Sequence, residues 1–310
     1  MFIKKNLLTS LVFVSANLTG YVEASVIFDG RFSTGDFARY SVLEANGLSA
    51  GGVAYPAGIG QHLSLVADPV FLGRSVMAAS RFGGDLPTHG GYRSEVSVSP
   101  DPLATERWYS WGVYFPIDWN PYRSEVVVMQ IHDTADVFES GLREPTFRVS
   151  VQDGSLRLIN SYDYDLVTSP PGSIPARKGV DYTQRILATV PVQIGAWTYF
   201  DLHAVWAGND SGSLQVWGNG VSLFSEVGHI NTFNDERGVW FKAGAYAYPN
   251  SDWTSLTTLF TGVRIGDGGE SLQSMSMVPE PPFGAMLLVG LPLLIGRVRR
   301  LNGSRRRPAG

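Results

Sequence analysis

The chain has 310 residues, no cysteine, and 24 basic against 28 acidic side chains, which gives a formal net charge of −4. Eight of the basic and two of the acidic residues lie in the terminal segments 1–24 and 278–310. Residues 25–277 therefore carry 16 basic and 26 acidic side chains, a net charge of −10. This sign of charge argues against a nucleic-acid-binding domain. The absence of cysteine excludes disulfide bonds and thiolate chemistry.

The amino-terminal segment 1–24 has the pattern of a secretory signal peptide. Lys4 and Lys5 provide a positively charged start, residues 7–18 are mostly apolar, and Val22-Glu23-Ala24 offers a small-residue cleavage site. A membrane-spanning helix needs about 20 apolar residues. We therefore expect this segment to be cleaved during export rather than retained as an anchor.

Residues 25–277 are typical of one all-β domain. Short apolar runs recur along them, turn residues such as Asn219-Gly220 separate the runs, and long amphipathic helical windows are absent. The expected strands are Ser25–Phe28, His62–Val66, Ser75–Arg81, Arg93–Val98, Trp108–Phe115, Val126–His132, Thr146–Val151, Leu156–Asn160, Thr198–Trp206, Leu214–Trp217, Val239–Tyr246 and Leu259–Ile265. This pattern predicts an antiparallel two-sheet β-sandwich of the jelly-roll type.

The segment 161–185 interrupts this rhythm with three prolines, three tyrosines and three basic residues, and it shows no periodicity. Loops of this length are usually functional or disordered, and both interpretations stay open. Above a cleft, the tyrosines would stack on sugar rings and the basic residues would meet carboxylates. Trp253 is a second candidate for a platform on which a sugar ring stacks.

The stretch Gly238–Pro249, GVWFKAGAYAYP, places chemically active side chains on one face of an expected strand. The period of two in a strand directs Trp240, Lys242 and Tyr246 to one side, and directs the apolar residues between them to the other. The apolar face suits packing against a second sheet. The face with a cation, a phenol and an indole suits a ligand.

Two earlier segments also place polar side chains together on one face of an expected strand. Gln130 and His132 share one face of the expected strand 125–132, and Arg93 and Glu95 share one face near the start of another. The alternative interpretation is the ordinary polar outer face of an antiparallel sheet. Because three segments agree in residue type, we expect them to lie side by side and to form one site.

These segments also resemble a known family. RSEV at 93–96, QIH at 130–132 and WFKAGAY at 240–246 resemble, in this order, the three signature blocks of jelly-roll alginate lyases. ERWYSWGVYFPIDW at 106–119 is similar to the heparin lyase I and glucuronan lyase relatives of that fold. The resemblance covers residues 27–267 and implies a concanavalin A-like jelly roll with a concave substrate groove.

Two positions depart from the alginate lyase pattern. Trp240 begins a block that is usually written YFKAG, and Ala247-Tyr248 stands where alginate lyases typically have Asn-Gln. The second departure bears on the identity of the substrate more than on the reaction.

The resemblance implies cleavage of a uronic-acid polysaccharide by β-elimination, without a metal or a cofactor. Hydrogen-bond donors on the sugar carboxylate make the proton on C5 removable, a base takes this proton, and an acid protonates the leaving oxygen. Tyr246 would be the acid, and also the base if a nearby cation such as Lys242 lowers its pKa. Whether His132 or Tyr246 is the base stays open.

The candidate site residues fall into two groups, and the resemblance assigns roles to the first. The catalytic residues are Arg93, Gln130, His132 and Tyr246. The substrate-binding residues are Lys242, Glu95, Trp240, Tyr248 and Trp253. Glu95 is expected to orient Arg93 rather than to react.

A polyanionic substrate requires a locally basic cleft in a domain whose net charge is negative. The candidate cations are Arg93, Arg143, Arg148, Lys178, Arg185 and Lys242. Other chemistries lack their motifs, since the sequence contains no G-x-S-x-G elbow and no EF-hand loop. The remaining histidines stand singly, without the spacing of metal ligands.

The carboxy-terminal segment 278–310 contains Val278-Pro279-Glu280-Pro281, then 14 mainly apolar residues, and then a series of arginines. This order resembles the PEP-CTERM sorting signal. The resemblance implies recognition and removal by exosortase-type machinery at the inner membrane of a Gram-negative bacterium, with only transient membrane contact. The expected location is secreted, at the cell surface or in the extracellular matrix.

The leading hypothesis is an exported polysaccharide lyase that acts on a glucuronan- or alginate-like polyuronate. The alternative is a non-catalytic carbohydrate-binding or extracellular matrix protein with the same fold. Retention of Gln130, His132 and Tyr246 together favours the enzyme, because binding alone does not require a phenol opposite an imidazole.

Overall fold

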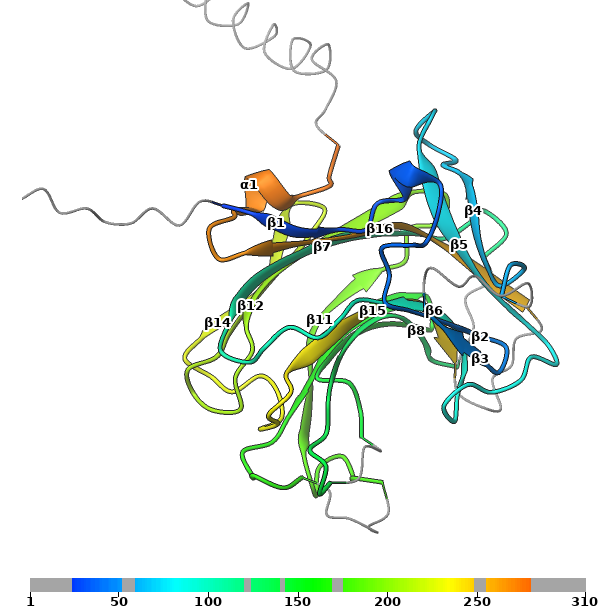
Figure 1. The fold of residues 1–310 in the computed structure, drawn as a ribbon. Helices are drawn as coiled ribbons and strands as arrows, with labels where there is room; N and C mark the ends of the chain where they lie inside the picture. Colours follow the sequence, from blue (N-terminus) through cyan, green and yellow to red (C-terminus); the bar gives the residue numbers. More distant parts are fainter. Residues whose placement is uncertain are drawn as a thin grey trace, which may run out of the picture.

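The structure, a computed structural model, describes residues 24–51, 59–119, 124–139, 143–168, 175–247 and 255–279. These residues form two eight-stranded antiparallel sheets that stack face to face (Figure 1). The first sheet has the strand order β14-β13-β12-β7-β16-β5-β4, with β1 paired to β16. The second sheet has the order β11-β10-β9-β8-β15-β6-β2-β3.

Each sheet collects strands from the whole length of the chain. The first sheet contains β1 (Val26–Asp29), β4 (Leu63–Ala67), β5 (Ser75–Phe82), β7 (Glu106–Tyr114), β12 (Trp197–Val205), β13 (Ser213–Gly218), β14 (Val221–Val227) and β16 (Ser255–Asp267). The second sheet contains β2 (Val42–Ala45), β3 (Leu48–Ala50), β6 (Tyr92–Ser97), β8 (Val126–Asp133), β9 (Phe147–Gln152), β10 (Ser155–Tyr162), β11 (Thr183–Pro191) and β15 (Val239–Ala247). The described helices are η1 (Phe32–Thr34) and α1 (Leu272–Met275). In the described part of the chain, no helix has the length and apolar character needed to cross a membrane.

The hydrophobic core fills the space between the two sheets and follows the alternation of each strand. Phe241 and Ala245 of β15 point into it, and Trp111 of β7 meets them from the first sheet, only 1% exposed. The ring centroids of Trp111 and Phe241 are 5.8 Å apart in an edge-to-face arrangement. Burial of a large apolar side chain stabilises the fold by about 1.5–3 kcal/mol, so these alternating positions fix which face of β15 points outward.

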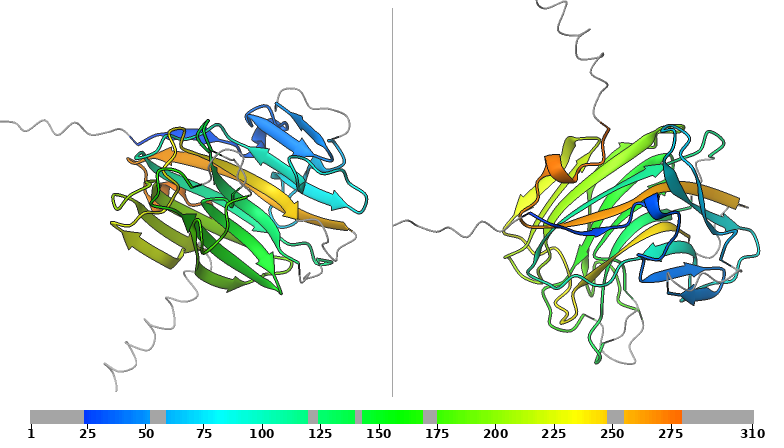
Figure 2. Two further views of the ribbon diagram at one scale, coloured as in Figure 1. Left: turned by 90° about the horizontal axis from the view of Figure 1, so that it is seen from below. Right: turned by 45° about the horizontal axis from the view of Figure 1, so that its top comes forward.

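The second sheet is curved, and its hollow side faces away from the first sheet (Figure 1). Figure 2 shows the same layers from two further directions. The described chain ends lie against the first sheet, because β1 pairs with β16 and α1 contacts β7 and β16. The outward face of the second sheet is therefore separated from both ends by the thickness of the sandwich.

Two β-bulges shape the centre of the second sheet. The pairing of β8 with β9 shifts between Val127 and Met129, and the pairing of β15 with β8 shifts between Ala243 and Tyr246. Gly244 lies in the second bulge with a φ of 151°, and a Cβ atom there would lie 2.0 Å from the carbonyl oxygen of Ser94. Only glycine fits this close approach of two backbones.

The predicted all-β antiparallel sandwich is confirmed, and the twelve expected strands correspond to strands of the structure. Four strands were not predicted, namely β2, β3, β11 and β14. The segment 161–185 is less irregular than expected, because β10 continues to Tyr162 and β11 begins at Thr183. The signal-peptide and sorting-signal segments fall almost entirely outside the described residues and stay predictions.

We expect Gly244→Ala to lower the free energy of unfolding by more than about 4 kcal/mol, because its methyl group would collide with the β6 backbone. Gly154→Ala is the matched control. Gly154 has a φ of 72° but no atom within 4 Å of the added Cβ, so only backbone strain of about 1–2 kcal/mol should appear. Thermal or denaturant unfolding measures both variants. Equal losses of stability in the two would show that the close contact at Gly244 does not matter.

Candidate active site

The three polar segments lie on adjacent strands at the centre of the second sheet, in the order β8-β15-β6. Across β15, Tyr246 pairs with Arg93 of β6, and Trp240 pairs with His132 of β8. The backbone pairing thus places these side chains on one outward face, opposite the core residues between them. The prediction that the three segments form neighbouring strands is confirmed.

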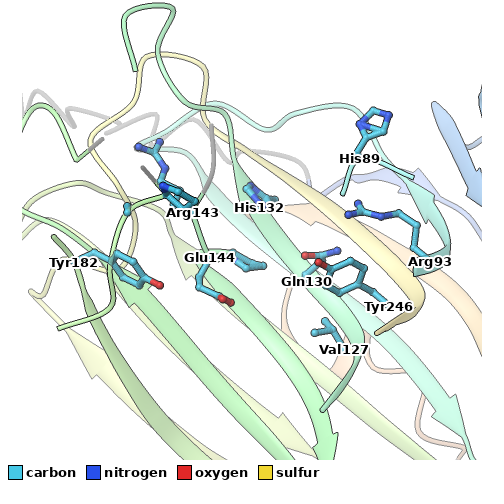
Figure 3. Close-up of a pocket in the computed structure, with 12 residues that line it drawn as sticks. His89, Arg93, Val127, Gln130, His132, Arg143, Glu144, Tyr182 and Tyr246 are labelled. Carbon is cyan, nitrogen blue, oxygen red and sulfur yellow. The ribbon is translucent and has the colours of Figure 1, made fainter. Parts of the chain in front are cut away.

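A pocket of about 290 Å³ opens on this face (Figure 3). Four of the predicted site residues lie around it, with Arg93 and Tyr246 at one side and Gln130 and His132 toward the middle (Figure 3). The pocket is lined by His89, Arg93, Val127, Gln130, His132, Arg143, Glu144, Pro145, Pro175, Ala176, Tyr182 and Tyr246. The structure therefore brings together all four residues to which the family resemblance assigns catalytic roles.

The ring of Tyr246 is held between a cation and a glycine. The guanidinium carbon of Arg93 lies 4.6 Å from the ring centroid, and a Cβ atom added to Gly91 would lie 2.1 Å from a ring carbon. Burial raises the pKa of Tyr246, and the carboxylates of Glu95 and Glu144 add to this, while Arg93 opposes it. Tyr246 is therefore protonated at neutral pH and can donate a proton.

This result corrects the expected effect of Lys242 on Tyr246. The cation against the phenol ring is Arg93, and the pKa of Tyr246 is raised rather than lowered. Lys242 shares the outward face of β15, but its ammonium group contacts Glu44 of β2 at 2.5 Å and Glu95 at 3.2 Å. Lys242 is 4% exposed and is not among the residues that line the pocket.

A buried charge cluster lies beneath the pocket and orients two of its donors. Glu44 and Glu95 both contact Lys242, and each also lies 3.5 Å from Arg93 Nη1. Gln130 Nε2 donates a hydrogen bond to Glu95 Oε1 at 2.6 Å. Burial alone would raise the pKa of Glu44, but Lys242 and Arg93 outweigh it and lower this pKa. Glu95 thus orients Gln130 as well as Arg93, and the second N–H of the Gln130 amide can be donated to a ligand.

His132 is oriented by the residue that follows it. Its Nδ1 lies 2.8 Å from the backbone oxygen of Asp133 and 3.3 Å from Asp133 Oδ1. Both partners are acceptors, so Nδ1 carries a proton, and in the neutral imidazole the lone pair is then on Nε2. An imidazole held in this tautomer can accept a proton at Nε2.

Arg143 holds Asp133 and joins it to a cluster of acidic residues. Arg143 Nε donates to Asp133 at 2.5 Å, Nη1 contacts Glu139 at 3.0 Å, and Nη2 contacts Asp235. Although burial opposes the change, His132 and Arg143 lower the pKa of Asp133. Burial raises the pKa of Asp235 to about 8, with Arg143 opposing the shift.

Part of this acidic cluster has the spacing of a metal site. Carboxylate oxygens of Asp136, Glu139 and Asp235 lie within 4.8 Å of one another, and within the described residues this is the one group of three or more such ligands. The guanidinium of Arg143 already contacts Glu139 and Asp235 and supplies positive charge there. Hard cations such as calcium bind oxygen ligands of this type, so these three residues are the ones that could hold an ion.

Sequence reasoning missed four residues of the site: Glu44, His89, Glu144 and Tyr182. Tyr182 belongs to the tyrosine-rich segment 161–185, and burial raises its pKa to about 12. Its position shows that part of this segment contributes to the pocket wall. Glu44, His89 and Glu144 belong to no recognisable motif, and no pattern in the chain pointed to them.

The predicted substrate-binding residues have different positions. Trp240 is half-buried, and its ring centroid lies 6.2 Å from that of His132. Glu95 and Lys242 lie below the pocket in the buried cluster. Tyr248 and Trp253 fall outside the described residues.

In the described part of the chain, five of the six candidate cations for a basic cleft are paired with carboxylates. Arg93, Arg143 and Arg148 each contact at least two carboxylates. Arg185 is paired with Glu226 at the edge between the two sheets, and Lys242 is paired with Glu44 and Glu95. Lys178 is exposed and is not among the residues that line the pocket. Paired cations create little positive potential in the pocket.

Comparison with solved structures agrees with the fold. The endo-β-1,4-glucuronan lyase from the fungus Trichoderma reesei is similar in structure, with a TM-score of 0.61 and 18% identity over 81% of this chain and 98% of that chain. The family 7 alginate lyase A1-II′, as a double variant in complex with the substrate GGMG, has a TM-score of 0.52. Its identity is 12% over 78% of this chain and 99% of that chain. These likenesses confirm the jelly-roll fold.

Sequence comparison gives the family. No curated protein sequence matches the chain. The family profile described as polysaccharide lyase matches residues 32–263, which is well over half of the 310 residues. The chain therefore belongs to the polysaccharide lyase family.

Proposed function

We propose that this lyase cleaves a uronic-acid polysaccharide of the glucuronan or alginate type by β-elimination at the pocket on the second sheet. The observation that carries the proposal is the convergence of Arg93, Gln130, His132 and Tyr246 on one pocket of about 290 Å³. The similar solved structures support it, since one is named a glucuronan lyase and the other an alginate lyase.

The first step is removal of the proton on C5 of the uronate. The electron pair of the C5–H bond moves toward the sugar carboxylate, whose negative charge grows. Arg93 and the amide of Gln130 would donate hydrogen bonds to this carboxylate, and stabilisation of developing charge by oriented donors is among the largest effects in enzyme catalysis. Glu95 holds both donors in place, so little reorganisation is needed.

The second step is expulsion of the glycosidic oxygen on C4. The C4–O bond breaks, a double bond forms between C4 and C5, and the leaving oxygen takes a proton. Tyr246 would supply this proton because its raised pKa keeps it protonated. His132 would be the base, since hydrogen bonding at Nδ1 leaves the Nε2 lone pair to accept the proton from C5.

The stereochemistry of the substrate decides whether this division of roles is required. In guluronate or iduronate the departing proton and oxygen lie on opposite faces of the ring, which demands two separate groups. In glucuronate or mannuronate they lie on the same face, and one tyrosine can in principle serve both steps. The alginate lyase A1-II′ in complex with GGMG carries one His-to-Asn and one Tyr-to-Phe replacement, which supports roles for both residue types.

Export is the remaining part of the proposal. It is supported by the signal-peptide pattern of residues 1–24 and the PEP-CTERM pattern of residues 278–310. The described chain ends lie against the first sheet, and the pocket opens on the second. Removal of both terminal segments would therefore leave the pocket unchanged.

We expect Tyr246→Phe to lower kcat by roughly 10²–10⁴-fold while KM changes far less, because the ring stays and only the proton donor is lost. Tyr164→Phe is the control, since Tyr164 is an exposed tyrosine bonded to Asp210. Ultraviolet absorbance of the unsaturated uronate product measures turnover on glucuronan, alginate, heparin and hyaluronan. Near-full activity of Tyr246→Phe on every substrate that the unaltered enzyme cleaves would disprove the role of this phenol.

We expect the pH profile of kcat to fall on its alkaline side with a midpoint above 10.0, the ordinary pKa of tyrosine. The folded-state pKa of Tyr246 is raised, so its acid form persists to higher pH and is lost only above that value. The residual activity of Tyr246→Phe should lack this alkaline limb. An activity that instead rises as Tyr246 ionises would make the phenolate the base.

We expect the mature protein to start near Ser25 and to end near Met277, because both terminal segments carry processing signals. Intact-mass spectrometry of protein recovered outside the cell measures both ends. Material that retains Arg305–Arg307 would contradict processing of the carboxy-terminal segment.

A further inference from the structure

The charged groups at and below the pocket are predominantly acidic. Four cations there, Arg93, Lys242, Arg143 and Arg148, contact seven different carboxyl groups. The carboxyl groups belong to Glu44, Glu95, Glu125, Asp133, Glu139, Glu144 and Asp235. Even if Asp235 is protonated, the acids outnumber the cations. Among the described residues, these four cations and seven carboxyl groups together therefore carry a net negative charge.

The four cations also differ in how accessible their side chains are to a ligand. Arg143 lines the pocket, but three carboxylates surround its guanidinium and its side chain is 1% exposed. Arg148 is held by Glu125 and Glu144, and its side chain is 5% exposed. Arg93 has the most exposed side chain of the four cations, at 11%, and lies 3.5 Å from each of its two carboxylates. The pocket is thus built to receive one sugar carboxylate, beside Arg93 and Gln130.

Glu144 adds a negative charge to the pocket wall itself. Its side chain is 28% exposed, and in Figure 3 it lies between Tyr182 and Gln130. Its charge contributes to raising the pKa of both Tyr182 and Tyr246, so it acts on both sides of the pocket. Glu144 shares the single positive charge of Arg148 with Glu125, so this group of three keeps a net negative charge. A second sugar carboxylate beside it would meet a like charge, which is unfavourable.

The remaining wall suits an uncharged sugar. Val127, Pro145, Pro175 and Ala176 line the pocket beside the ring of Tyr182. Such surfaces bind the apolar faces of sugar rings, and their aliphatic side chains offer no hydrogen-bond donor to a carboxylate. The reacting uronate is therefore recognised at one end of the pocket, and the space next to it favours a neutral neighbour.

We infer that, among uronic-acid polysaccharides, the enzyme prefers an acidic heteropolysaccharide whose uronates are separated by uncharged sugars over a homopolymer of uronate. This inference rests on the proposed function, because it concerns the substrate of the same elimination reaction. A homopolymer places a carboxylate on every ring, and among the described residues Arg93 and Gln130 form a pair of oriented donors for one of these carboxylates. In a heteropolymer the rings that flank the reacting uronate carry no charge toward Glu144.

The first experiment compares kcat/KM on glucuronan with kcat/KM on hyaluronan and gellan, in which uncharged sugars separate the glucuronates. All three polymers carry a sugar on O4 of glucuronate, so the elimination step is the same. EDTA in the assay removes divalent cations that could bridge carboxylates. We expect roughly tenfold or greater preference for at least one of the two heteropolymers. Equal or faster cleavage of glucuronan would overturn the inference and leave the proposed function intact.

The dependence of kcat/KM on ionic strength distinguishes an acidic pocket from a basic cleft, because the two predict changes of opposite sign. Salt screens repulsion between the acidic pocket and a homopolymer, so kcat/KM on glucuronan should rise as salt is added. A basic cleft would produce a fall, because salt would screen attraction. On the heteropolymers the change should be smaller. A clear fall with salt on glucuronan would contradict the acidic character of the pocket.

The substitution Glu144→Gln tests whether Glu144 discriminates between the polymers. Arg148 keeps Glu125 as a partner at 3.1 Å, so the pocket wall should remain folded. We expect the ratio of kcat/KM on glucuronan to that on the preferred heteropolymer to rise severalfold, roughly threefold or more. Glu106→Gln on the first sheet removes the same charge beside His203, far from the pocket, and should leave the ratio unchanged. An unchanged ratio in Glu144→Gln would exclude Glu144 as the source of discrimination.

A binding measurement separates failure of this inference from failure of the proposed function. Affinity electrophoresis of Tyr246→Phe in gels that contain each polymer reports recognition without turnover. If no polymer yields unsaturated product, the lyase proposal for these substrates fails, yet tighter binding of a heteropolymer still supports the inference. Tighter binding of glucuronan would overturn the inference whatever the turnover.

Discussion

The buried pairing of Glu44 and Glu95 with Arg93 and Lys242 is the interaction on which the rest of the site depends. It joins β2, β6 and β15 beneath the pocket. Buried charges are tolerated only when they are paired, and loss of one partner typically costs about 3–5 kcal/mol. These four side chains therefore hold one another in place. Through Glu95 they also fix Gln130, so that the donors that face the sugar are already oriented before a ligand binds.

The backbone supplies the second requirement, which is the close lateral approach of β6 and β15. The β-bulge at Gly244 keeps Tyr246 beside Arg93 after the register with β8 has shifted. Gly91 leaves space for the phenol ring on its other side. Because the Tyr246 ring lies between the Arg93 guanidinium and the backbone of Gly91, its side chain has few alternative rotamers. The sheet itself thus positions the proton donor, whereas Tyr182 and Glu144 lie in the segments that precede β11 and β9.

The architecture and the central part of the site could be predicted because both follow from local patterns. Alternation in β6, β8 and β15 decided which side chains face outward, and the order of three short blocks indicated that these strands are neighbours. The strands that were missed lack such a pattern. β11 and β14 are edge strands with partly exposed residues on both faces, and β2 and β3 are only four and three residues long.

The electrostatics of the site could not be predicted, because they arise from partners that are distant in the sequence. Lys242 lies four positions before Tyr246 on the same face, which suggested that it would lower the pKa of the phenol. Its actual partner is Glu44, 198 positions away. Arg143, expected to contribute to a basic cleft, is instead enclosed by the nearby Asp133 and Glu139 and by Asp235, which is 92 positions away. Composition indicated the net charge of the domain correctly, but only the fold reveals how the charges are paired.

This pairing has a consequence for catalysis. A cleft of unpaired cations would bind a polyanion strongly before and after the reaction, and such uniform binding does not accelerate the chemical step. Donors that are already held by buried carboxylates attract the ground-state substrate weakly, but they are aligned with the carboxylate whose charge grows in the transition state. The acidic surroundings also disfavour ionisation of Tyr246 and keep its proton available for the leaving oxygen. The same negative charges that weaken attraction of the polymer thus support the role of the phenol as an acid.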